Sequence, residues 1–120
     1  MTVPDTFHEH CRRSGGSYYA GNDTQLSVTI KCQPGKRNEV KTIWESMTRP
    51  HAESNDKVQF SCYSFANEDA DAIILFEVLS DSEVLTTLYQ EEWFKKYLAA
   101  MGPLLAGPPE IVTGTPVWIK

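Results

Sequence analysis

An apolar run near the middle of the chain, Ala72–Leu79 with the sequence AIILFEVL, most constrains how this protein can fold. The side chain of Glu77 is the one charged group within it. Eight residues are too few to span a membrane as a helix, which needs about 20. A strand that is apolar on both faces is typical of the centre of a sheet whose two faces are both covered. The run therefore predicts a central strand with a packed layer on each side.

The residues before this run predict two more strands and one helix. Residues 26–32 alternate between apolar and polar side chains, as a half-buried strand does. From residue 36 the period changes to 3.6, which predicts an amphipathic helix that ends before Pro50. Residues 49–56 are polar and predict a loop. Residues 57–65 are rich in aromatic and β-favouring side chains and predict the next strand.

The residues after the run predict a helix in two pieces and a last strand. The S-x-x-E pattern from Ser80 to Glu83 is typical of a capping box at the start of a helix. A second helical segment opens at residue 91 and ends at the Gly-Pro pair of residues 102–103. Residues 111–119 predict a fourth strand, in which Pro116 favours an edge or a chain-exchange position.

This order of elements, βαββαβ, predicts an α+β, ferredoxin-like fold with an antiparallel sheet and the helices on one face. No further element remains to cover the second face of the sheet. We therefore expect a second copy of the chain to cover it, as a homodimer with the sheets face to face. Residues 24–120 form the predicted single domain. Residues 1–23 lack periodicity and predict a flexible N-terminal extension.

Composition excludes several partners. A net charge of −5 and a pI near 5.1 leave no broad basic surface, so a nucleic-acid partner is not expected. No apolar run is long enough for a membrane span, and the start of the chain lacks the features of a secretory signal, so we expect a cytoplasmic protein without a membrane partner. Cys11, Cys32 and Cys62 have no disulfide-like or metal-like spacing; the latter two fit small buried strand positions. His8 and His10 would point apart on a strand, so no metal site is expected.

Several short motifs also occur in a fixed order over about residues 25–118. They are P-G-K at residues 34–36, Phe76-Glu77 near the end of the apolar run, the Ser-Asp-Ser-Glu helix start, the Trp93-Phe94 pair, and a closing P-L-L…P-P-E-I at residues 103–111. Together they resemble the antibiotic biosynthesis monooxygenase (ABM) domains of the dimeric α+β barrel superfamily. The resemblance implies a homodimer in which each subunit holds a pocket between its sheet and its helices. It also implies, for many members, cofactor-independent oxygenation of polycyclic phenolic substrates.

The chain departs from that family at three positions. Many members have a histidine in the middle of the helix after the third strand and another just before its Phe, where this chain has Leu88 and Trp93. Haem-degrading relatives have a tryptophan two residues after the strand glutamate, where this chain has Leu79. These differences argue against haem chemistry.

The mechanism implied by the resemblance needs aromatic pocket walls and a proton acceptor. Glu77 is the first catalytic candidate, because burial of a carboxylate raises its pKa toward the range of a general base. It could equally be a structural acceptor, paired with Lys, Arg or backbone amides. His51 and Tyr63 are the other catalytic candidates. The candidate substrate-binding residues are Trp44, Phe76, Tyr89, Trp93 and Tyr97, although aromatic residues at helical spacing also build cores.

The sequence thus predicts a monooxygenase-like enzyme without cofactor or metal, acting on an aromatic, polyketide-type small molecule of secondary metabolism. Two alternatives stay open: a non-oxidative cyclase, isomerase or decarboxylase using the same pocket, and a non-catalytic binding or accessory protein. An enclosed pocket of roughly several hundred Å³ with a buried polar group would favour an enzyme. A pocket filled by Leu88 and Trp93 would favour the binding protein.

Overall fold

The computed structural model describes residues 23–120. The strands are β1 (Thr24–Lys31), β2 (Val58–Phe65), β3 (Ala72–Leu79) and β4 (Glu110–Gly114). The helices are α2 (Arg37–Met47), α3 (Arg49–Ser54), α4 (Glu83–Leu88) and α5 (Glu92–Met101), followed by the 3₁₀ turn η1 (Gly102–Leu104). The predicted N-terminal extension, with His8 and His10, lies outside the described residues except for Asp23, which is buried directly before β1.

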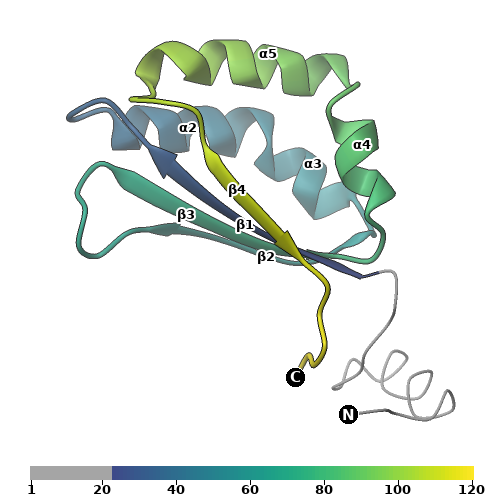
Figure 1. The fold of residues 1–120 in the computed structure, drawn as a ribbon. Coiled ribbons are helices and arrows are strands. Elements are labelled where there is room, and N and C mark those ends of the chain that lie inside the picture. Colours follow the sequence, from purple (N-terminus) through teal and green to yellow (C-terminus); the bar gives the residue numbers. More distant parts are fainter. Residues whose placement is uncertain (1–22) are drawn as a thin grey trace, which may run out of the picture.

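The strands form one antiparallel sheet in the order β2-β3-β1-β4, so β1 and β3 are central and β2 and β4 lie at the edges. Figure 1 shows the helices together on one side of this sheet, while the tail after β4 leaves toward the other side. This arrangement confirms the predicted α+β, ferredoxin-like fold with helices on one face. It also confirms that the last strand lies at an edge.

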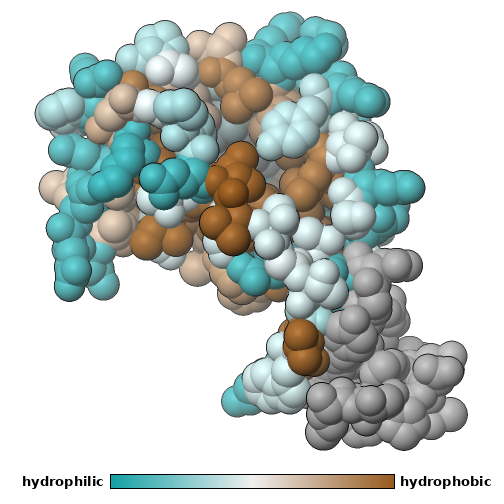
Figure 2. All heavy atoms as spheres, viewed as in Figure 1, coloured by the Kyte–Doolittle hydropathy of each residue, from teal (hydrophilic) through white to brown (hydrophobic). Residues whose placement is uncertain are grey.

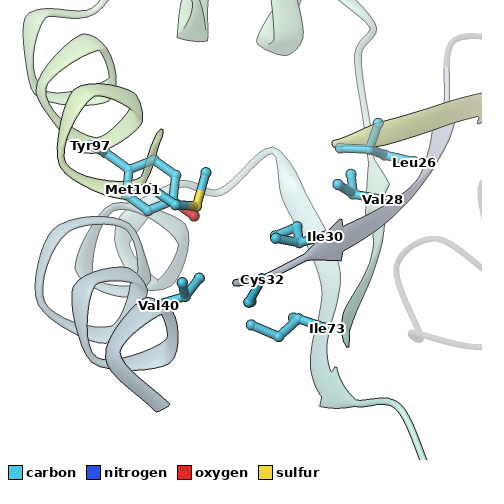
Figure 3. Close-up of a cluster of buried hydrophobic side chains, with 8 residues drawn as sticks. All are labelled: Leu26, Val28, Ile30, Cys32, Val40, Ile73, Tyr97 and Met101. Carbon is cyan, nitrogen blue, oxygen red and sulfur yellow. The ribbon is translucent and has the colours of Figure 1, made fainter. Parts of the chain in front are cut away.

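The core lies between the sheet and the helices. The alternation predicted for the first strand is confirmed, because Leu26, Val28, Ile30 and Cys32 are all buried. Figure 3 shows Val40 of α2 and Tyr97 and Met101 of α5 pointing from the helices toward these strand residues and toward Ile73 of β3. Helix residues at a spacing of 3.6 and strand residues at a spacing of two thus meet in one apolar layer.

The structure corrects three local predictions. Residues 49–54, predicted as loop, form α3 with Pro50 in its first turn, where a missing backbone N–H breaks no helical hydrogen bond. The predicted capping box does not form; instead the Asp81 side chain accepts a hydrogen bond from the Glu83 backbone N–H at 2.9 Å. The last strand ends at Gly114 rather than at residue 119.

The face of the sheet away from the helices is open in the single chain. Phe60 of β2 and Ile74 and Phe76 of β3 lie on it, with exposed fractions of 53%, 43% and 37%. Cys62 shares this face and is exposed, so the prediction that it is buried is wrong for the single chain. Apolar side chains are also exposed on β4, and Figure 2 shows apolar residues gathered at the centre of the view, where β4 runs in Figure 1.

Candidate functional site

Glu77 lies on the side of the sheet that the helices cover. It is paired across β3 with the buried Leu26 of β1 and with Ser61 of β2. The Ser61 hydroxyl donates a hydrogen bond to Glu77 Oε2 at 2.9 Å. Burial raises the pKa of Glu77, and the hydrogen bond from Ser61 partly opposes that shift. Within residues 23–120, no lysine or arginine forms an ion pair with this carboxylate.

Tyr63, Trp44 and Tyr97 are aromatic side chains on the same, helix-covered side of the sheet as Glu77. The rings of Trp44 and Tyr63 stack, with their centroids 4.0 Å apart and their planes 15° apart. Burial raises the pKa of Tyr97 to about 12 and raises the pKa of Tyr63 further still. Both phenols therefore keep their protons near neutral pH and can act as hydrogen-bond donors. Tyr97 is close enough to Tyr63 and Glu77 to interact with them electrostatically.

His51 and Trp93 lie together at an opening between α3 and α4. Their rings stack with centroids 3.7 Å apart and planes 3° apart. They line a cavity of about 290 Å³, together with Leu88 and residues of α3 and α4. This cavity is open to solvent rather than enclosed, and Leu88 and Trp93 line it without filling it.

A second hollow, of about 320 Å³, lies on the other side of α3 along the edge of β2. Trp44 and Ser61, the neighbours of Tyr63 and Glu77, are among its lining residues. His51 of α3 faces the first cavity and Ala52 lines the second hollow. α3, the helix that sequence reasoning missed, thus lies between two hollows, and the second of these reaches Trp44 and Ser61.

The side chains of the two remaining candidate residues, Tyr89 and Phe76, do not lie beside that of Glu77. Tyr89 is half exposed and contacts Phe94 edge-on at 5.5 Å; Phe94 in turn contacts Trp93 and Tyr97. Phe76 lies on the open face of the sheet, where it contacts Phe60 edge-on at 5.9 Å. Its expected position between sheet and helices is wrong, because successive side chains of a strand point to opposite faces and Glu77 points under the helices.

Sequence reasoning missed two polar residues of this site. Ser61 holds Glu77, and only the strand register brings the two together. The buried hydroxyl of Thr48, between α2 and α3, lies beside the Tyr97 phenol and lowers its pKa. A threonine two residues before a proline is a helix N-cap signal, and that signal would have indicated α3. No cluster of three or more potential metal ligands occurs among residues 23–120, and no helix there is long and apolar enough to cross a membrane.

No protein-family model matches the chain, and neither does any curated protein. Solved structures do match. A provisionally named antibiotic biosynthesis monooxygenase from Caulobacter crescentus superposes with a TM-score of 0.74 and 21% identity, over 92% of this chain and 99% of that one. One from Nitrosomonas europaea has a TM-score of 0.73 and 12% identity, over 83% of this chain and 95% of that one. One from Chloroflexus aurantiacus has a TM-score of 0.67 and 21% identity, over 79% of this chain and 93% of that one. The chain therefore has the fold of the proteins named antibiotic biosynthesis monooxygenases, which confirms at the level of the fold the resemblance seen in its motifs.

Proposed function

We propose that this protein is a cofactor-independent, ABM-like monooxygenase that acts on an aromatic, polyketide-type small molecule of secondary metabolism. The proposal is supported by the shared fold with proteins named antibiotic biosynthesis monooxygenases. The observation that carries it is the Glu77 carboxylate. It lies beneath the helices among aromatic side chains, with a raised pKa and without a cationic partner in the described residues.

A carboxylate in this setting suits proton abstraction better than structural support. An ion pair with lysine or arginine would hold its pKa low and keep it structural. Here burial dominates, so the pKa moves toward neutrality, where a general base is most effective. The single hydrogen bond from Ser61 leaves the other oxygen, Oε1, available to a substrate proton.

The proposed reaction needs no electron donor besides the substrate. Glu77 takes a proton from an acidic carbon of an anthrone-type ring, and the resulting carbanion reduces O₂ by one electron. The two radicals combine to a peroxide anion, which takes the proton back from Glu77, and the resulting hydroperoxide loses water to give the quinone. One oxygen atom of O₂ enters the product and the other leaves as water. Trp44, Tyr63 and Tyr97 would hold the planar anion in a water-poor site, where Tyr63 and Tyr97 donate hydrogen bonds.

Oxygen uptake by the purified protein with an anthrone tests this function. We expect uptake coupled to quinone formation, and a fall of kcat by about 100-fold or more in Glu77→Gln, as for loss of a general base. A matched His51→Asn variant should keep its activity if Glu77 is the base. If it instead loses the activity that Glu77→Gln retains, the proton acceptor is His51. Turnover that is unchanged without oxygen would show the non-oxidative enzyme, and ligand binding without any turnover would show the binding protein.

We also propose that two copies pack their open sheet faces together. The apolar side chains of Phe60, Ile74 and Phe76 remain partly exposed there in the single chain, and the C-terminal residues 115–120 border the hollow that Phe60 and Phe76 line. A contiguous apolar sheet face of this kind is a usual interface in homodimers. In such a dimer the Phe76 side chain would belong to the interface and not to the substrate pocket.

A further inference from the structure

The residues after β4, 115–120, form a short apolar arm on the open side of the sheet. Figure 1 shows the arm leaving β4 toward the side away from the helices. Its Val117 and Trp118 are 71% and 67% exposed, the highest values among the large apolar side chains that the structure describes. Tryptophan is usually well buried in folded proteins. The arm therefore presents apolar surface that the described part of its own chain leaves uncovered.

A hollow of about 1,030 Å³ lies beside this arm. The open-face side chains of Phe60, Phe76 and Val78 line it from the sheet, and residues of the arm border it. Phe60 and Phe76 contact each other edge-on and remain 53% and 37% exposed. The hollow is wide and open to solvent, so it suits a protruding segment of protein better than an enclosed small molecule.

Polar side chains surround the apolar centre of the hollow. Asp56, which precedes β2, and Lys120 of the arm carry opposite charges there. Neither of them forms an ion pair within residues 23–120. A polar rim around an aromatic centre is typical of protein–protein interfaces, in which a few tryptophan, tyrosine and arginine side chains supply most of the binding energy. The lining thus favours a protein surface as the occupant.

A second copy of the chain is the occupant that fits, because the arm and the hollow lie on the same side of the molecule. Two copies related by a two-fold axis satisfy both arms and both hollows at once and leave neither over. An aromatic side chain presents roughly 200–250 Å², so Phe60, Phe76 and Trp118 alone expose about 350 Å² per copy and about 700 Å² in two copies. The exposed Ile74, Val112 and Val117 bring this area toward the roughly 1,000 Å² of a specific interface.

We infer that the arms are exchanged in the dimer, with Trp118 of one copy inserted against Phe60 and Phe76 of the other. This inference rests on the proposed pairing of the open sheet faces and names the residue that anchors it. Because the arm lies on the open side of the sheet, any copy that covers this face also meets the arm. Insertion removes the exposed surface of Trp118 from water and brings Lys120 to the oppositely charged rim of the second copy.

Sedimentation equilibrium of the wild type and of two variants tests the inference. Trp118→Ala should raise the dissociation constant by about 1,000-fold, about 30-fold for each of the two contacts, the usual effect of truncating a buried aromatic anchor. The matched control is Ile111→Ala. Ile111 is 49% exposed and lies on the strand that carries the arm, but it pairs with the buried Val28 and so faces the helix side. The control should leave the dissociation constant unchanged.

Fluorine NMR of the protein labelled with fluorotryptophan follows Trp118 directly. Its signal, identified by its absence in Trp118→Ala, should shift as the protein concentration passes through the dissociation constant. A signal that does not change on dimerisation would show that the arm rests on its own chain and would overturn the inference. A dimer that Phe60→Ala weakens and Trp118→Ala does not would also overturn it and leave the pairing of sheets standing. A wild type that stays monomeric would refute both.

Discussion

Phe60→Ala is the sharpest test of the proposed pairing of sheets. The Phe60 ring is 53% exposed on the open sheet face and contacts Phe76 edge-on. A phenylalanine presents about 200 Å² of surface, so about 100 Å² of Phe60 remains for a partner to cover. At about 25 cal/mol per Å² this area is worth up to about 2.5 kcal/mol per chain. A two-fold dimer contains the contact twice, about 5 kcal/mol in all, so the dissociation constant should rise by up to about 4,000-fold.

Sedimentation equilibrium over a range of protein concentrations measures this constant. Tyr89→Ala is a closely matched control, because Tyr89 is 50% exposed and also loses one edge-on ring contact, but lies on the helix side of the molecule. It should leave the dissociation constant unchanged. A wild type that stays monomeric at high concentration would refute the reasoning, as would two variants that weaken self-association equally.

Three further predictions concern the single chain. Since burial raises the pKa of Glu77, its charged form is destabilising once the pH rises past the ordinary glutamate value of about 4.3. Glu77→Gln should therefore raise the melting temperature at pH 8 and not at pH 4, and an equal change at both pH values would contradict this. Arg37 donates hydrogen bonds to the backbone carbonyls of Ala66 and Asp69 at the β2–β3 turn. Its guanidinium carbon lies 3.9 Å from the centroid of the Phe65 ring. Arg37→Met should lower the free energy of unfolding in urea by about 2 kcal/mol, and a loss below about 0.5 kcal/mol would count against these contacts. In a Cys11→Ser background, and at a protein concentration low enough to keep the chain monomeric, the exposed Cys62 should react with a thiol reagent at once. Cys32, whose thiol is buried and has a raised pKa, should react only on unfolding; equal rates would contradict the burial pattern.

Much of the fold could be predicted because its signals are local. The first strand alternates and the helix with Val40 repeats every 3.6 residues, and each period selects its element. The run Ala72–Leu79, apolar except for Glu77, indicates a central strand by its length and composition. The order of elements then left few topologies to consider. α3 was missed because its six residues bury nothing, so no apolar period marks it.

The candidate site could be predicted only in part. Glu77 could be identified because burying a carboxylate within an apolar strand costs free energy unless it has a partner or a function. That signal lies within a few residues of sequence. Ser61 and Thr48 carry no such signal, because each gains its meaning from a neighbour that only packing supplies. The sequence likewise could not say on which face of its strand Phe76 would lie, since both faces of that strand are apolar and either register buries apolar side chains.

The sequence by itself thus determined which elements form and in what order, because backbone period and turn chemistry act between near neighbours. The tertiary structure decided which side chains share a space. It placed Glu77 under the helices and Phe76 on the open face, and it left the Tyr63 hydroxyl buried without a partner among residues 23–120. Those outcomes depend on strand register and on how the helices pack across the sheet, which bring together residues far apart in the chain and are not encoded by any single stretch of it.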